Sequence, residues 1–395
     1  MSSCSPNAAR KIHRRDKSRA VLGQCAQLRT NPTGLGALIV PAFQNCVSGA
    51  CEEMKAVLFR EHGGPEKLSY EELPMPKIGP QDVLIRVKAC ALNHLDLWVR
   101  QGSPAYTVPL PHVGGSDVSG TVEQTGAQVE GIAVGTQVFV SPGISCWNCE
   151  FCLAGQDNMC RTYNLLGAGR HGGYAEYVNV PFRNVLPIPE NVTVEQAAAF
   201  PLVSVTAFHM LFGLAKLQTG ETMLVMGAGS GVGMMAVQLA KLAGARVITT
   251  VGSDDKIPKA VILGADAVIN HSKEKVSERV KLLTEGRGVD VVIEHIGPEV
   301  WDSCVESLSK GGRLITCGAT TGGDVTLNLR SLYSRQLTVK GSYMGTRAEL
   351  VKAAELMGQK RLVAVIDRTF PLQEARAAQE LMASRKFFGK IVLVC

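Results

Sequence analysis

The distribution of apolar and polar positions divides the chain after residue 53 into two regions. Between residues 54 and 190, short alternating stretches are separated by Gly and Pro, which predicts a β-rich unit resembling a partly closed barrel. Its expected strands are MKAVLFR, DVLIRVKAC, SGTVEQTG, TQVFVSPG and GGYAEYVNV. The stretch TVEQAAAFPLVSVTAFHMLFGLA (193–215) then takes up the period of an apolar helix.

The second region alternates continuous apolar runs with amphipathic segments. The runs ETMLVMGAG, RVITTV, DAVIN, VDVVIEHIG and GRLITCG have the composition of strands buried on both faces. Helical segments lie between them, namely GVGMMAVQLAKLAG, DKIPKAVILG and 273–285. Repeated strand–helix units predict an α/β fold with a doubly wound parallel sheet. The final run, FGKIVLV, is expected to be a strand that returns to the first domain.

Composition narrows the class of protein. The chain has 395 residues, a hydrophobic fraction of 46% and a charged fraction of 19%, which indicates a folded protein long enough for two domains. No apolar run reaches the roughly 20 residues that span a bilayer, so no membrane segment is expected. Most of the net charge of +6 lies before Met54, and the nearly neutral remainder gives no indication of a nucleic-acid surface.

Residues 1–53 are expected to lie outside the fold. They contain basic and small residues, few acids and no sustained period, and ARKIHRRDKSRA resembles the start of an organelle transit peptide. A disordered leader, or a start misassigned upstream of Met54, explains the same composition. The scattered cysteines Cys90, Cys304, Cys317 and Cys395 favour a reducing compartment. The expected location is therefore the cytoplasm, or a mitochondrion or other organelle if the leader is a transit peptide.

Four closely spaced cysteines predict a metal site. Cys146, Cys149, Cys152 and Cys160 are separated by two, two and seven residues. Four thiolates satisfy the tetrahedral coordination of one structural zinc and leave no open position for substrate. An iron–sulfur cluster would accept the same ligands, but nothing else in the sequence suggests electron transfer.

A glycine-rich turn predicts a dinucleotide site. The sequence LVMGAGSGVGMMA follows a buried strand and opens a helix, which is the setting that a pyrophosphate site requires. The expected cofactor-binding residues of this turn are Gly227, Gly229, Ser230, Gly231, Val232 and Gly233.

The end of the next strand bears on the choice of nicotinamide cofactor. Enzymes that select NAD usually carry Asp or Glu there, whereas this strand ends in Val251, Gly252 and Ser253, with Lys256 a turn later. The small Ser253 would leave room for a 2′-phosphate and Lys256 would supply a positive charge to bind it, which favours NADPH. NADH is the alternative cofactor, because Asp254 or Asp255 could instead face the adenosine ribose.

From Met54 to Cys395 the chain resembles the medium-chain dehydrogenase/reductase superfamily. The motifs DVLIRVKACALNHLDLW, the cysteine lobe, GGYAEYVNVP, AGSGVG and FGKIVLV occur in that family's order. The resemblance implies a GroES-like catalytic domain over 54–200 with a zinc lobe at 145–161, and a Rossmann domain over 201–345. It also implies a C-terminal return over 346–395 and a homodimer formed through strands around RQLTVKGSYMG.

The resemblance breaks at the catalytic zinc that alcohol dehydrogenases of this family carry. The three ligand positions hold Asn93, Ser116 and Leu202. The motifs LNHLD and PLVSVTAFH are similar instead to the quinone oxidoreductase branch, which lacks that zinc but also lacks the cysteine lobe. Substitute ligands from His94, His112, Cys90 and Asp117 stay an alternative.

These features predict an oxidoreductase that transfers hydride from NADPH to a small molecule, either a quinone or an activated double bond of an enone or enal. Negative charge can then spread over an enolate or phenolate, which hydrogen-bond donors stabilise without a Lewis acid. The expected catalytic residues are Asn93 as donor, Asp96 beside it and Thr206 facing the nicotinamide, with Trp98 as a pocket wall. Asp96 could equally cap the helix that follows it. The alternatives are a zinc-type alcohol dehydrogenase and a non-catalytic dinucleotide-binding protein.

Overall fold

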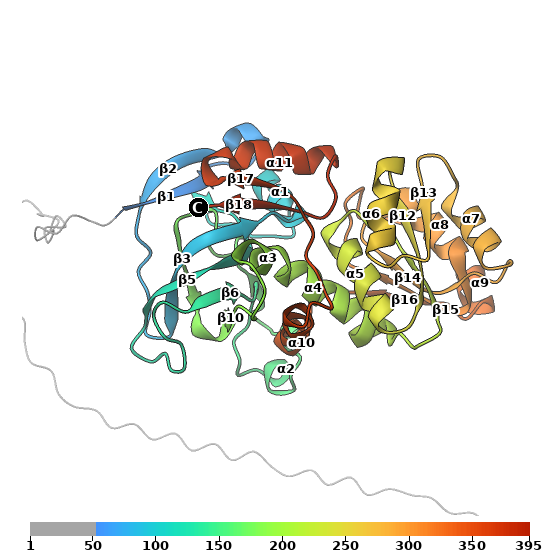
Figure 1. Ribbon diagram of the computed structural model, residues 1–395, viewed down its shortest axis with the longest axis horizontal. Helices are drawn as coiled ribbons and strands as arrows, with labels where there is room; N and C mark the ends of the chain where they lie inside the picture. Colours follow the sequence, from blue (N-terminus) through green and yellow to red (C-terminus); the bar gives the residue numbers. More distant parts are fainter. Residues whose placement is uncertain (1–52) are drawn as a thin grey trace, which may run out of the picture. The chain divides into compact units, whose positions relative to one another are not determined.

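The computed structural model describes residues 53–395, which are organised around two large sheets (Figure 1). The prediction of a leader at 1–53 therefore falls outside the described residues, except at Glu53, where the first strand begins. One sheet has seven strands and the other has six parallel strands with helices between them. This arrangement confirms the predicted α/β class with a doubly wound parallel sheet.

The seven-stranded sheet is built around one long strand, β3. The first half of β3 pairs with β9, and its last residues, Ala89–Ala91, pair with β18 from the C-terminus. The strand order is β10-β6-β5-β3-β18-β17, and a separate three-stranded sheet has the order β2-β1-β4. The bounds are β1 (Glu53–Phe59), β2 (Ser69–Pro74), β3 (Asp82–Ala91), β4 (His112–Val113), β5 (Asp117–Thr125), β6 (Gln137–Val140), β7 (Gly143–Ile144), β8 (Asn164–Leu165), β9 (Tyr177–Pro181), β10 (Val185–Pro187), β17 (Ile366–Pro371) and β18 (Lys390–Val394).

The six-stranded sheet has the order β13-β12-β11-β14-β15-β16, with every neighbouring pair parallel. The strand order reverses between β11 and β14, and this reversal opens a crevice at the carboxyl ends of the strands. The strands are β11 (Thr222–Val225), β12 (Arg246–Val251), β13 (Ala267–Asn270), β14 (Val289–Glu294), β15 (Leu308–Thr316) and β16 (Thr338–Gly341). The helices that follow them are α5 (Gly231–Leu242), α6 (Ile257–Ile262), α7 (Val276–Leu283), α8 (Pro298–Ser307) and α9 (Leu329–Ser334).

The apolar stretch 193–215 forms three helical segments instead of one. Helix α3 (Val194–Ala199) ends before Pro201, which begins α4 (Pro201–Phe208), because proline cannot donate the hydrogen bond that would continue α3. The segment His209–Ala215 is then π-helical and ends where Lys216 takes a left-handed φ of 54°. The remaining α-helices are α1 (His94–Gln101), α2 (Glu150–Leu153), α10 (Arg347–Gly358) and α11 (Ala375–Ser384).

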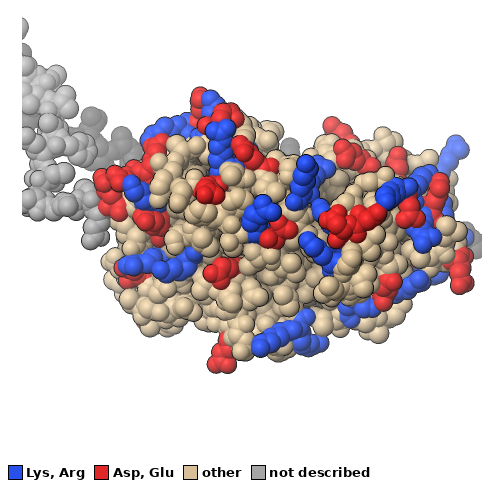
Figure 2. Space-filling model, turned by 45° about the horizontal axis from the view of Figure 1, so that its top comes forward, with Lys and Arg blue, Asp and Glu red and all other residues tan. Residues whose placement is uncertain are grey.

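The surface carries charges of both signs. Lys and Arg lie interspersed with Asp and Glu over the face in Figure 2, and several form ion pairs, such as Arg86 with Glu123. Within residues 53–395, no helix combines the length and apolar character needed to cross a bilayer.

Candidate active site and metal centre

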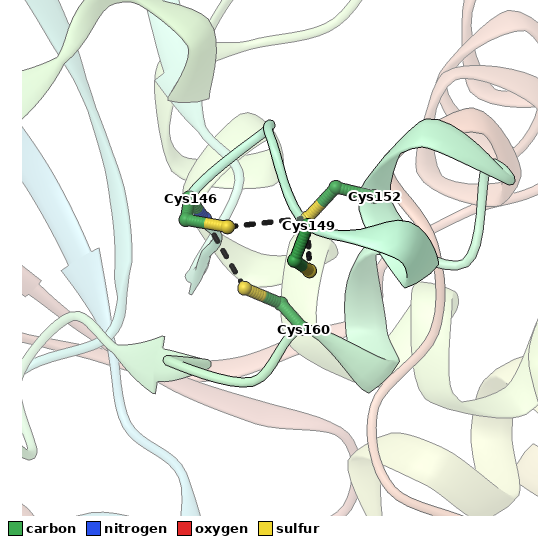
Figure 3. A group of neighbouring side chains, drawn as sticks. All are labelled: Cys146, Cys149, Cys152 and Cys160. Carbon is green, nitrogen blue, oxygen red and sulfur yellow. Dashed lines mark hydrogen bonds between the residues drawn. The ribbon is translucent and has the colours of Figure 1, made fainter. Parts of the chain in front are cut away.

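The four cysteines predicted to bind zinc lie together in one lobe (Figure 3). All four sulfur atoms lie within 4.8 Å of one another, and the Sγ atoms of Cys149 and Cys152 are 3.6 Å apart. Zinc–sulfur bonds of about 2.3 Å in a tetrahedron require sulfur–sulfur edges of about 3.8 Å, so this donor set fits zinc. Backbone N–H groups of Cys152 and Arg161 lower the pKa of Cys149 to about 6, which favours the thiolate.

This lobe contacts the segment that follows β16. The carboxylate of Asp157 accepts a hydrogen bond of 3.0 Å from the backbone N–H of Arg347, at the start of α10. The amide of Asn158 donates to the carbonyl oxygen of Tyr343 at 3.4 Å, and the Tyr163 ring packs edge-on against Tyr343. The cysteine lobe is therefore attached to the segment between β16 and the start of α10.

The glycine-rich turn lies between β11 and α5, as the motif predicts. Gly227 has a left-handed φ of 69°, and a Cβ on Gly233 would lie 2.1 Å from the Gly227 carbonyl oxygen, so only glycine fits there. The Ser230 hydroxyl accepts a 2.9 Å hydrogen bond from Gly233 N–H and caps α5. Ser230 also lies 2.9 Å from Nε2 of His295, a contact that no sequence pattern indicates.

The end of β12 lies beside several basic groups. The stem of Lys256 lies 3.7 Å from the place of a Cβ on Gly229, and its ammonium donates to the Arg385 carbonyl at 3.0 Å. Burial lowers the pKa of His271, and the charges of Lys256 and Arg385 lower it further.

The two acids after β12 differ in their surroundings. Asp254 accepts a 2.6 Å hydrogen bond from Asn270 and also pairs with Lys273. Its carboxylate is therefore engaged toward β13, although Asp254 is exposed, as Asp255 is.

A buried cluster joins three of the candidate residues to the C-terminal strand. The Lys390 ammonium donates to Asn93 Oδ1 at 2.6 Å and to Asp117 Oδ2 at 3.1 Å. Asn93 Nδ2 donates to the same carboxylate oxygen at 2.9 Å, and Asp117 Oδ1 accepts from the Leu202 N–H at 2.8 Å. Lys390 is 2% exposed and Asp117 is fully buried, so each charge depends on the other.

Asp96 lies inside α1, in its first turn, instead of preceding the helix as one of the two sequence interpretations expected; Asn93 is the N-cap residue, and the Asp96 side chain completes a capping box with it. Its Oδ2 accepts a 2.7 Å hydrogen bond from the Asn93 N–H, and its Oδ1 accepts a longer one from the Gly115 N–H. Burial raises the pKa of Asp96 to about 6. The carboxylate thereby fixes the backbone of Asn93.

Thr206 lies on α4, and its hydroxyl donates to the Leu202 carbonyl on its own helix at 2.7 Å. It also lies 4.0 Å from the sulfur of Met344.

Comparisons with known proteins agree with this geometry. Residues 79–190 match the profile of the alcohol dehydrogenase GroES-like domain, and residues 231–359 match that of the zinc-binding dehydrogenases. A NAD-dependent alcohol dehydrogenase of Sulfolobus acidocaldarius is 33% identical over 350 residues, which cover 86% of this chain and 99% of that protein. The chain belongs to the medium-chain dehydrogenase/reductase superfamily.

Other relatives within this superfamily carry different names. A quinone oxidoreductase of Salmonella typhimurium is 30% identical over 349 residues, covering 85% of this chain and 98% of the relative. A crystal structure of a NAD-dependent alcohol dehydrogenase superposes with a TM-score of 0.84 at 43% identity, covering 87% of this chain and all of that one. The chain is therefore an oxidoreductase of this type, and the names alone leave its substrate open.

The three positions that the resemblance assigns to catalytic zinc ligands, Asn93, Ser116 and Leu202, lie around Asp117. Asn93 and the backbone of Leu202 both bond to Asp117, and the neighbouring Ser116 is buried with no hydrogen-bond partner. Among residues 53–395, the only group of three or more Cys, His, Asp or Glu side chains able to hold one ion is the cysteine lobe. The substitutes weighed from the sequence, namely His94, His112, Cys90 and Asp117, are not brought together as such a group.

Lys390 is the residue of this cluster that sequence reasoning missed as a site residue. It lies in the run FGKIVLV, where a lone lysine in an apolar strand is the only signal that could have indicated it. Lysine is almost never fully buried unless it is paired, so such a residue indicates a buried acceptor elsewhere in the fold.

Proposed function

We propose that the protein is an NADPH-dependent reductase of quinones or of alkenes conjugated to a carbonyl group, and that it works without a catalytic zinc. The observation that carries this proposal is the cluster of Asn93, Asp117 and Lys390. It joins an amide, a carboxylate and an ammonium, and the family resemblance assigns the Asn93 position to a ligand of the catalytic zinc.

The chemistry requires a hydride donor and stabilisation of an oxyanion. The cofactor, when bound, supplies the hydride, which adds to the far carbon of the conjugated system and sends an electron pair to the oxygen. Asn93 Nδ2 uses one N–H for Asp117 and keeps a second N–H for that oxygen. A proton from solvent then completes the product.

Asp96 and Thr206 have supporting roles in this proposal. Asp96 holds the Asn93 backbone through its cap of α1. Thr206, on the helix that carries Leu202, would face the nicotinamide.

The surroundings of β12 support NADPH over NADH. The acid nearest the strand end, Asp254, is engaged by Asn270 and Lys273, while Lys256, His271 and Arg385 form a basic group there. A 2′-phosphate would gain charge-assisted hydrogen bonds from Lys256 and Arg385, whereas the lowered pKa of His271 favours a neutral imidazole there.

Replacing Lys256 tests the cofactor preference. Lys256→Met is expected to raise the Kd for NADPH about tenfold to a hundredfold and to leave the Kd for NADH within about twofold, because one charge-assisted contact contributes about 1.5–3 kcal/mol. Titration calorimetry with both cofactors measures this. Lys281→Met, the same change on the exposed face of α7, is the matched control. Equal losses for both cofactors would place Lys256 on the pyrophosphate instead.

The function itself is tested by turnover and metal content together. Purified protein is expected to oxidise NADPH in the presence of quinones and enones, and to contain about one zinc per chain, the content of a single Cys₄ site. Absorbance at 340 nm and elemental analysis give the two readouts. Cofactor binding without turnover of any acceptor would reject the enzymatic reading.

An alcohol dehydrogenase is the second candidate, and the names of the Sulfolobus relative and of the crystal structure favour it. Its signature is a second zinc per chain together with oxidation of simple alcohols by NAD. The same metal and turnover measurements separate it from the first proposal.

We also propose that the protein forms a homodimer through β16. A separate proposal is that it is located in a reducing compartment such as the cytoplasm. Strand β16 is the last strand of the parallel sheet, and Leu329 and Tyr333 of the adjoining α9 are 69% exposed. An exposed edge strand beside an apolar surface is a ready site for pairing between chains. Sedimentation equilibrium measures the mass of the assembly, and imaging of a tagged full-length chain locates it in cells.

A further inference from the structure

A crevice of about 500 Å³ opens at the carboxyl ends of β14, β15 and β16. Its floor includes Glu294, Thr316 and Ser342, and Trp98 and Tyr106 from the other region of the chain line it as well. Trp98 was expected from the sequence as a pocket wall. The volume suits a small molecule or one half of a dinucleotide.

Two buried polar atoms in this lining have no partner. Glu294 is 1% exposed; its Oε2 accepts 2.9 Å hydrogen bonds from the N–H groups of Ile296 and Gly297, while Oε1 has no hydrogen-bond partner. The Ser342 hydroxyl is buried and unpaired as well. An unpaired buried carboxylate oxygen costs more free energy than a paired one, so its retention calls for a donor that the protein alone does not supply.

The topology tells which part of a dinucleotide would reach this crevice. The pyrophosphate belongs at the glycine-rich turn after β11, and the basic group belongs to the end of β12. A dinucleotide crosses the sheet at the reversal of strand order, so its other half extends from β11 toward β14 and β15. The backbone places Glu294 there, because Met226 N–H bonds to Ile293 O at 2.9 Å.

We infer that the free oxygen of Glu294 binds the hydroxyls of the nicotinamide-side ribose, an inference that rests on the proposed use of NADPH. Ribose hydroxyls are donors, and carboxylates at strand ends recognise them in dinucleotide folds. The other carboxylate oxygen stays on the two N–H groups at the start of α8, which fixes the side chain before the cofactor arrives.

Glu294→Gln tests this assignment with little disturbance of the fold. The glutamine carbonyl oxygen can keep both backbone N–H bonds, while its NH₂ group replaces the acceptor in the crevice. The probes form a series: NADPH; 2′-phospho-ADP-ribose, which lacks nicotinamide; and 2′-phosphoadenosine 5′-diphosphate, which also lacks the second ribose. Glu299→Gln, the same change at an exposed position of α8, is the matched control.

The Kd values for NADPH and 2′-phospho-ADP-ribose are expected to rise about tenfold to a hundredfold in Glu294→Gln, as for a lost hydrogen bond to a charged group. The Kd for the ribose-free probe is expected to stay within twofold, and Glu299→Gln to leave all three unchanged. Loss of NADPH affinity alone would assign Glu294 to the nicotinamide instead, and equal affinities or equal losses for all three probes would also overturn the inference. Failure of the wild-type protein to bind NADPH at all would instead reject the proposed function.

Discussion

Lys390→Met is expected to lower the free energy of unfolding by about 3–5 kcal/mol, because it leaves the Asp117 carboxylate buried without its cation. Asp117 is fully buried, so water cannot solvate the charge that is left behind. The same substitution removes the donor to Asn93 Oδ1. Urea denaturation followed by tryptophan fluorescence and by circular dichroism measures the change.

A matched control and a double variant separate the ion pair from simple packing. Lys88→Met makes the same change at an exposed position of β3 and is expected to alter stability by less than about 0.5 kcal/mol. Adding Asp117→Asn to Lys390→Met removes the stranded charge and is expected to recover part of the loss. If Lys390→Met were as stable as Lys88→Met, the ammonium would have no role in holding the cluster.

Cys160→Ser is expected to reduce zinc from about one per chain to nearly none and to unfold the lobe at 145–161, because a structural zinc supplies the folding free energy of such a loop. Limited proteolysis should then cut within the lobe. Asp157 and Asn158 hold Arg347 and Tyr343, so the loss extends to the segment after β16, which includes Ser342 of the crevice. NADPH binding should weaken as a consequence.

Removal of zinc from the wild-type protein by a chelator should reproduce both effects, and Cys395→Ser should show neither, because Cys395 lies outside the ligand group. Intact zinc content and an uncut lobe in Cys160→Ser would contradict the assignment of the metal ligands.

Local features of the chain were predicted most completely. The cysteine spacing places four thiols within one short loop, and that loop can bring them together whatever the rest of the chain does. The glycine-rich turn is similar, since strand, turn and helix are consecutive. Buried strands read as apolar runs, so the parallel sheet was also predictable.

Predictions were weaker where one pattern allows two structures. The apolar period at 193–215 continues through Pro201 without a change, yet the backbone has to break there. In the sequence, Asp96 is equally compatible with capping a helix and with a role in the substrate cleft. Only its hydrogen bond from the Asn93 N–H shows that it takes part in capping.

By itself, the sequence predicted the fold class, the group of four cysteines and the glycine-rich turn, because repeated strand–helix units and short motifs are set by neighbours along the chain. Only the tertiary structure showed which side chains contact one another across long stretches of sequence. Lys390 meets Asn93 across 297 positions, and Asp254 accepts a hydrogen bond from Asn270. Glu294 likewise becomes an unpaired acceptor only when the folded chain buries it beside a crevice. Sheet pairing joins strands that lie far apart along the chain, such as β18 and β3. The residues that it brings into contact therefore show no pattern in the sequence that would predict the contact.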